Sequence, residues 1–193
     1  MIDSSEEPGL EQVRTLILQL KRRLDSHMRD RWHRSLPLEE LLFDRWERAR
    51  SLGFGEGTSI YQSSYIYGDV QVGAGCWIGP FTLLDGSGGL EIGDHCDLSA
   101  GVQIYTHDTA KRAVSGGKAG VDHAPVRIGS CCYIGPNVIV QRGVTIGEHT
   151  IVGACSFVNR DIPPYSMAIG TPCRRIGRIV VNDRDVDIEY DHR

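Results

Sequence analysis

Aliphatic residues recur at every sixth position along most of the chain between Ile60 and Val158. The repeat slips by two residues at GSGG (86–89) and stops after Ile104, to resume in phase at Ile128. A period of six fits neither the 3.6-residue period of an α-helix nor the two-residue period of a plain strand. The fourteen positions are Ile60, Ile66, Val72, Ile78, Leu84, Ile92, Leu98, Ile104, Ile128, Ile134, Val140, Ile146, Val152 and Val158.

Short strands joined by tight turns give this period. Seven of the fourteen aliphatic residues are followed directly by glycine, which accommodates a constrained turn backbone. Small residues dominate four positions after the aliphatic one, as at Cys76, Cys96 and Cys132, because a chain that closes on itself leaves little interior room. Three units then form one triangular coil, and stacked coils share one continuous apolar core.

This is the hexapeptide repeat, and residues 60–161 resemble the left-handed β-helix acyltransferases. The resemblance implies a mainly β fold, a left-handed parallel β-helix, a homotrimer, and acyl-CoA bound between neighbouring β-helices. We therefore expect an N-terminal helical segment (1–56), a β-helix (57–165) with a protruding loop (108–124), and a short C-terminal extension (166–193) that closes the CoA site.

The flanking segments carry other patterns. Apolar residues alternate three- and four-residue steps over 9–34, which predicts a helix. Ser35 is predicted to cap a second helix over LPLEELLFDRWERAR, with Gly53 beyond its end. Alternating apolar and acidic residues in DVDIEY (185–190) predict a short edge strand.

Composition limits the partners. A net charge of −4 argues against a general nucleic-acid binder, which needs a basic face. The seven Lys and Arg residues from Arg14 to Arg34 are read as a solvated helix face rather than a membrane contact. No apolar run is long enough to span a membrane and MIDSSEEPGL lacks the order of a signal peptide, so a cytoplasmic protein is expected. The six cysteines contain no CxxC pair, so we expect no metal site.

The segment IYTHDTAK (104–111) marks the break in the repeat. A loop that leaves a smooth prism beside a histidine is a way to build a pocket. In the sugar and xenobiotic acetyltransferases of this fold, a histidine at the loop root, often followed by an acid, is the catalytic base, and His107 in THD matches it. Imidazole suits the removal of a hydroxyl proton at neutral pH.

Three further residues are expected to contact the acceptor. Asp85 precedes His107 by 22 residues, a placement similar to that of the acceptor-contacting aspartate in galactoside and maltose acetyltransferases. The same Asp-Gly pair is also typical of a simple turn. Asp108 is placed to orient the imidazole or to point elsewhere, and His123 lies at the far foot of the loop.

The stretch GACSFVNRDIPPYSMAIGTPCRRIGRI resembles the closing signature of the family. Cys155 departs from it, since relatives usually have glycine there. CoA carries several negative charges, so an acidic protein needs local arginines to attract it. By position the resemblance implies that acetyl-CoA contacts Tyr133, Ala154, Asn159, Arg160, Arg174 and Arg175.

These features together predict an acetyl-CoA-dependent O-acetyltransferase that acts on a sugar hydroxyl, such as a glycan, lipopolysaccharide or capsule precursor. N-acetylation of a nucleotide-linked amino sugar stays open as an alternative. The absence of a DHATG-type signature disfavours a serine acetyltransferase. More remote alternatives are a γ-type carbonic anhydrase, for which His107 and His123 supply only two zinc ligands, and a non-catalytic β-helix scaffold.

Overall fold

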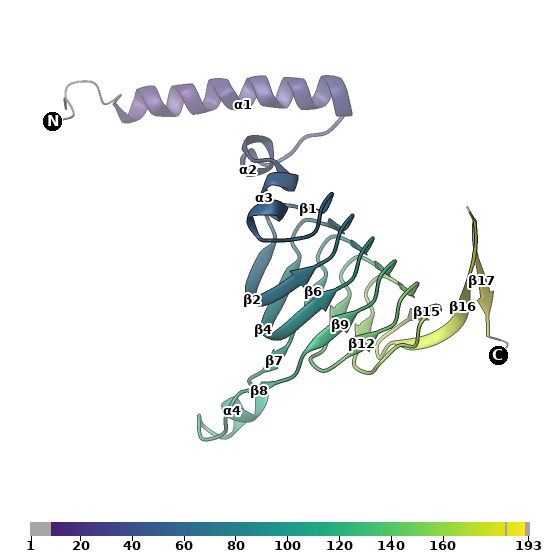
Figure 1. Cartoon of the computed structure of the whole chain (residues 1–193). Helices are drawn as coiled ribbons and strands as arrows, with labels where there is room; N and C mark the ends of the chain where they lie inside the picture. The colour runs from purple at the N-terminus through teal and green to yellow at the C-terminus, as the bar shows by residue number, and fades with distance from the viewer. Residues whose placement is uncertain (1–8, 184, 192–193) are drawn as a thin grey trace. The chain divides into compact units, whose positions relative to one another are not determined.

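The computed structural model describes residues 9–183 and 185–191 (Figure 1). Residues 1–8, 184, 192 and 193, which fall in the predicted N-terminal and C-terminal segments, lie outside the described residues. The chain divides into two compact units, up to Asp44 and from Arg45 onward. In the described part of the chain, no helix combines the length and the apolar character needed to cross a membrane.

The first unit is helical. Helix α1 (Leu10–Trp32) confirms the helix predicted over 9–34, and α2 (Leu38–Leu42) follows it. The single second helix predicted after Ser35 is wrong. Phe43 adopts an extended backbone (φ −116°, ψ 139°) that ends α2, Pro37 takes the N-cap position, and a separate helix α3 (Arg45–Ser51) opens the second unit.

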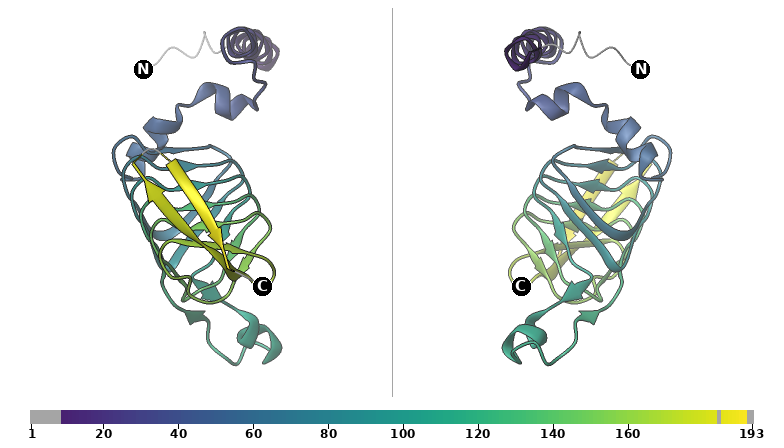
Figure 2. Two further views of the ribbon diagram at one scale, coloured as in Figure 1. Left: turned by 90° about the vertical axis from the view of Figure 1, so that its right-hand side faces the viewer. Right: turned by 90° about the vertical axis from the view of Figure 1, so that its left-hand side faces the viewer.

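The second unit is a prism of stacked parallel coils (Figures 1 and 2), which confirms the left-handed parallel β-helix. The coils contribute short strands to three faces. Face 1 contains β1 (Ser59–Ile60), β3 (Trp77–Ile78), β5 (Asp97–Leu98), β10 (Tyr133–Ile134), β13 (Ile151–Val152) and β15 (Ser166–Ile169). Face 2 contains the first halves of β2 (Tyr65–Val72) and β4 (Leu83–Ile92), followed by β6 (Gln103–Ile104), β11 (Ile139–Val140) and β14 (Phe157–Val158). Face 3 contains the second halves of β2 and β4, then β9 (Val126–Ile128) and β12 (Thr145–Ile146).

The repeat register matches the observed core. Thirteen of the fourteen aliphatic positions are buried, and Ile66 is half-buried and packs against the same cluster. The small residues Cys76, Cys96 and Cys132 are buried too, and each thiol donates a hydrogen bond to a glycine carbonyl 3.2 Å away on the next coil. They therefore fill the interior and also link neighbouring coils.

Glycine after an aliphatic residue has a steric reason. A Cβ on Gly135 would lie 2.7 Å from the backbone nitrogen of Ala154 on the next coil, closer than carbon side chains approach. The turns also contain non-glycine residues with left-handed backbones, among them Cys155 (φ 58°). Since L-residues rarely adopt this conformation, the Cys155 position favours glycine on steric grounds.

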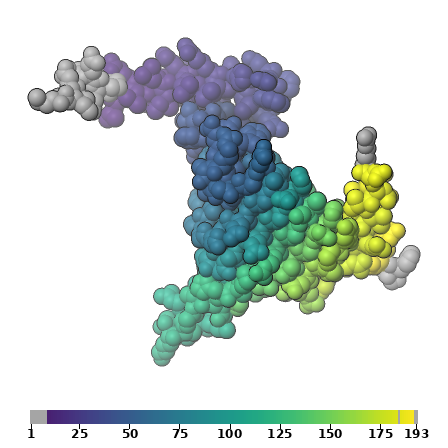
Figure 3. Space-filling model, viewed as in Figure 1, coloured from purple at the N-terminus to yellow at the C-terminus, as the bar shows by residue number. Residues whose placement is uncertain are grey.

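The chain leaves the prism at the corner between faces 2 and 3. Strands β7 (His107–Asp108) and β8 (Asp122–His123) form a two-residue antiparallel pair, and helix α4 (Ala110–Val114) lies in the excursion between them. Figure 3 shows this segment protruding from the coils. At the other end, β16 (Arg174–Asn182) pairs with β17 (Asp185–Tyr190), which confirms the predicted short strand.

Candidate active site

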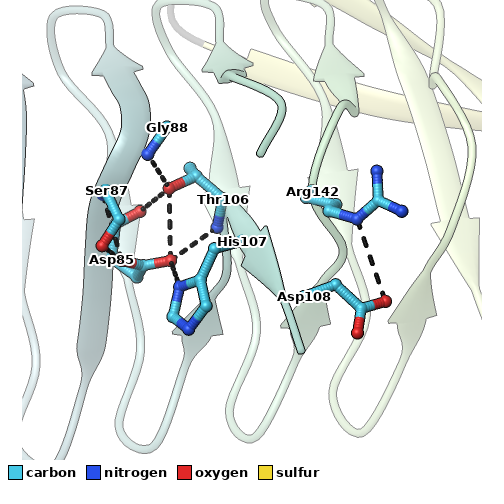
Figure 4. Close-up of polar contacts among 7 residues, drawn as sticks. All are labelled: Asp85, Ser87, Gly88, Thr106, His107, Asp108 and Arg142. Carbon is cyan, nitrogen blue, oxygen red and sulfur yellow. Dashed lines mark hydrogen bonds and ion pairs between the residues drawn. The ribbon is translucent and has the colours of Figure 1, made fainter. Parts of the chain in front are cut away.

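Asp85 and His107 meet at the corner between faces 2 and 3 (Figure 4). Asp85 lies in β4, where the GSGG slip bends the strand from one face to the next, and His107 begins the excursion one coil later. The Nδ1 of His107 lies 2.6 Å from Oδ2 of Asp85. The two interruptions of the six-residue repeat therefore lie side by side.

The Asp85 carboxylate is almost fully enclosed, with 1% of its surface exposed. Ser87 donates to Oδ1 from its backbone nitrogen (3.0 Å) and its hydroxyl (2.5 Å). The backbone N–H of Thr106 donates to Oδ2 (2.8 Å), and the Thr106 hydroxyl donates to the Asp85 carbonyl (2.8 Å). Burial by itself raises the pKa of Asp85, but the hydrogen bonds from Ser87, Thr106 and His107 outweigh it and hold the pKa below its ordinary value. The carboxyl is therefore ionised at neutral pH.

An ionised carboxylate only accepts hydrogen bonds, so Nδ1 of His107 must carry the proton in the neutral imidazole. Nε2 then holds the free lone pair. The His107 side chain is 36% exposed, and in Figure 4 Nε2 is the ring nitrogen directed away from Asp85. This geometry presents a proton acceptor to a molecule outside the prism, with its tautomer and ring orientation fixed from inside.

Asp108 faces away from the imidazole. Its Oδ1 accepts a hydrogen bond from the backbone N–H of Ala110 (2.7 Å), and its Oδ2 lies 3.8 Å from Nε of Arg142 on the next coil. Arg142 Nη2 also donates to Asp122 (3.2 Å), the residue opposite Asp108 in the β7–β8 pair. One guanidinium thus contacts an acid at each foot of the excursion.

The remaining predicted acceptor contact, His123, lies opposite His107 across the β7–β8 pair, with ring centroids 6.1 Å apart. The side chains of His107 and His123 are therefore brought together, while the Asp85 carboxylate is enclosed. The enclosure disfavours the predicted contact between Asp85 and the acceptor and favours a role in positioning His107.

A groove of about 320 Å³ begins at His107 and runs toward the later coils. Outward-facing residues of β11 and β14 line it, together with the first residues of the corner. Sequence reasoning singled out neither Ile139 and Phe157 nor Arg142, although the repeat register places Ile139 and Phe157 on the outside. The lining residues are Tyr105, His107, Asp108, Thr109, Ile139, Gln141, Arg142 and Phe157.

The predicted cofactor contacts divide into two groups. Asn159 and Arg160 follow β14 at the same corner, one coil beyond Gln141 and Arg142, so they continue the line of the groove. Tyr133 lies on face 1 in β10 and is 42% exposed. Arg174 and Arg175 are exposed residues of β16, next to face 1, and Ala154 lies in the turn between faces 1 and 2. A single chain thus presents the two groups on different faces.

Comparison with known proteins identifies relatives. The model of the bacterial transferase hexapeptide family (six repeats) matches residues 125–160. The structure of a maltose O-acetyltransferase from Clostridium difficile is 30% identical and superposes with a TM-score of 0.57, over 86% of this chain and 85% of that one. The chain belongs to the hexapeptide-repeat acetyltransferase family.

Other members of the hexapeptide-repeat acetyltransferases give similar matches. A hexapeptide-repeat acetyltransferase from Vibrio cholerae, solved with acetyl-CoA, has a TM-score of 0.61 and 26% identity over 90% of this chain and 92% of that chain. The galactoside O-acetyltransferase of Escherichia coli is 49% identical over 61 residues, 32% of this chain and 29% of that protein. The matched stretch therefore spans under a third of that curated relative.

Proposed function

We propose that this protein transfers an acetyl group from acetyl-CoA to a sugar hydroxyl. The observation that carries the proposal is the enclosed Asp85 carboxylate bonded to Nδ1 of His107, with Nε2 open beside a groove. The relatives named as galactoside and maltose O-acetyltransferases, and the Vibrio cholerae structure with acetyl-CoA, support this choice of donor and acceptor.

In the proposed reaction, Nε2 of His107 takes the proton of the acceptor hydroxyl as its oxygen attacks the thioester carbonyl. The carbonyl carbon gains a C–O bond and loses its C–S bond, and the imidazolium returns the proton to the departing CoA thiolate. Asp85 stabilises the imidazolium that forms in between, because the carboxylate already accepts from Nδ1. No covalent acyl-enzyme is needed.

The groove beyond His107 suits the pantetheine arm of the donor. Ile139 and Phe157 offer apolar contact, and Gln141 offers an amide that pairs with the amides of that arm. Arg160 continues the same line toward the position of the CoA phosphates.

A trimer would complete the site. Tyr133 and Arg174 lie on or next to face 1, whereas His107 lies at the corner between faces 2 and 3. One acetyl-CoA can contact both groups if face 1 of one copy lies against the His107 corner of another. Light scattering tests this arrangement, and a stable monomer that stays active at high dilution would contradict it.

The experiment that tests the function is an acceptor screen with acetyl-CoA and detection of free thiol. Sugars, amino sugars and nucleotide-linked amino sugars form separate arms, and mass spectrometry of the product separates O- from N-acetylation. Thiol release that depends on a sugar and disappears in His107→Ala supports the proposal. Release with amino sugars alone would favour the N-acetyltransferase alternative.

A further inference from the structure

His107 has two different sides along the prism axis. The groove proposed for acetyl-CoA is lined by residues of its own coil and of the two later coils, at Ile139 and Phe157. On the other side lie β4, which carries Asp85, and beyond it β2 of the first coil. A second substrate can therefore reach Nε2 of His107 over β2 and β4 without entering the donor groove.

Two tyrosines stand on that approach. Tyr65 and Tyr67 are 61% and 49% exposed, and the intervening Ile66 packs against the core. Because side chains alternate along a strand, the two rings share the outer surface of β2. Their centroids are 6.3 Å apart and their planes differ by 22°, so they form one stacked aromatic surface.

The strand register places this surface beside the catalytic corner. Tyr65 pairs with Leu83, and Tyr67 pairs with Asp85. Neighbouring strands lie about 4.8 Å apart, so Tyr67 is one strand spacing from Asp85 and about two from the coil that carries His107. That interval is close to the length of one hexose ring with its hydroxyl groups.

The backbone under Tyr67 is tightly packed. Gly68 has a left-handed backbone (φ 68°), and a Cβ placed on it would lie 2.6 Å from the carbonyl carbon of Gly86 on the next coil. A Cβ on Gly86 would in turn lie 2.1 Å from the backbone oxygen of Asp69. These two glycines therefore allow β2 to lie close against β4 beside Tyr67, where Tyr67 pairs with Asp85.

The chemistry of the surface selects a ligand class. A pyranose ring has C–H groups on its faces and hydroxyls at its rim, and an aromatic ring presents an apolar face with, for tyrosine, a polar tip. Exposed aromatic side chains beside a few polar groups are typical of small-molecule sites. A sugar that lies on the Tyr67 ring would keep its rim hydroxyls free to reach the imidazole.

We propose that Tyr65 and Tyr67 form the binding surface for the sugar ring of the acceptor, on the opposite side of His107 from acetyl-CoA. The proposal rests on the proposed acetyltransferase function and adds the residues that select the acceptor. Neither tyrosine transfers a proton or contacts the reacting carbonyl. Their contribution is to hold one hydroxyl of the sugar at Nε2.

The test compares Tyr65→Leu and Tyr67→Leu, which keep apolar bulk, with Tyr67→Phe, which keeps the ring. Tyr190→Leu is the matched control, because Tyr190 is 60% exposed on β17, away from face 2. Steady-state kinetics give KM for the sugar and for acetyl-CoA separately. Saturation-transfer NMR with methyl glycosides of galactose, glucose and N-acetylglucosamine measures sugar binding without turnover.

Each leucine variant should raise the sugar KM about three- to tenfold, the range expected for loss of one aromatic contact, and leave KM for acetyl-CoA unchanged. Tyr67→Phe and Tyr190→Leu should behave like the wild type. The inference is overturned if the leucine variants keep the wild-type sugar KM, or if no methyl glycoside binds the wild type. It is also overturned if the variants alter the oligomeric mass measured by light scattering and leave sugar binding unchanged. A wild type that binds methyl glycosides through these tyrosines but releases no thiol would instead contradict the proposed function.

Discussion

Nδ1 of His107 lies 2.6 Å from Oδ2 of Asp85, a residue 22 positions earlier in the chain. The contact joins the two places where the six-residue repeat is interrupted, the GSGG slip and the excursion after Thr106. Both interruptions break the regular stacking of the coils. Their meeting at Asp85 and His107 therefore marks the candidate active site.

Replacing His107 with alanine should lower kcat by about 10²–10⁴-fold, the usual range for loss of a positioned general base. KM for acetyl-CoA should hardly change, because the imidazole contacts the acceptor proton. The variant also removes a donor from the enclosed Asp85 carboxylate, so the free energy of unfolding should fall by about 1 kcal/mol. Steady-state kinetics and thermal unfolding measure these effects, and near-normal turnover would exclude His107 as the base.

Asp85→Asn should lower kcat about 10- to 10³-fold, because an amide can turn its N–H₂ toward Nδ1 and favour the tautomer that protonates Nε2. Ser87→Ala is the matched control, since Ser87 contacts Asp85 and not His107. It should reduce kcat only slightly. Equal effects in the two variants would indicate that Asp85 acts through the local fold and not through the imidazole.

Acid should destabilise the wild type in part through Asp85. Its pKa is lower in the folded protein than its ordinary value of 3.8, so its stabilising contribution is complete above about pH 5 and decreases as the pH falls toward the folded pKa. Asp85→Asn lacks this contribution. The difference in unfolding free energy between wild type and Asp85→Asn, measured by urea denaturation, should therefore be constant from pH 5 to 7 and shrink below pH 4. A difference that grows below pH 4 would contradict the assignment.

Arg142→Met should lower kcat/KM by about tenfold. The acids Asp108 and Asp122 are directly opposite in the β7–β8 pair, where like charges repel, and Arg142 contacts both. Lys111 also pairs with Asp122 (2.8 Å), and that hydrogen bond is the main cause of the lowered pKa of Asp122. Adding Asp122→Asn to Arg142→Met should restore part of the activity because it removes the repulsion. If kcat/KM of the double variant is no higher than that of Arg142→Met, repulsion between Asp108 and Asp122 is not the cause of the lost activity.

Arg174→Ala should raise KM for acetyl-CoA several-fold and largely spare kcat, which is the pattern expected when a residue binds the cofactor in ground and transition states alike. Arg174 is exposed on β16, far along the chain from His107. Arg178→Ala on the same strand is the control and should leave KM unchanged. Equal KM values for the wild type and Arg174→Ala would remove Arg174 from the cofactor site.

The repeat determined the core almost completely. A period of six fixes which residues face inward, and because one coil is three units long, it also fixes which residues become neighbours on successive coils. That is why the positions from Ile60 to Val158 lie in the interior as predicted. The single helix predicted after Ser35 was wrong because that prediction rested on local propensity alone and not on a repeat. Local propensity continues through Phe43, but the backbone turns extended there and ends α2.

At the site, the sequence singled out His107 by its place at the break and Asp85 by its spacing, but it did not decide what Asp85 does. The role depends on the bend of β4 at GSGG and on Thr106, which together enclose the carboxylate and direct Oδ2 at Nδ1. Arg142 and Tyr67 carried no motif at all. Strand register determines where both residues lie along the prism. Their contacts depend on the directions of side chains at a corner where the repeat is broken. Only the tertiary structure specifies those directions.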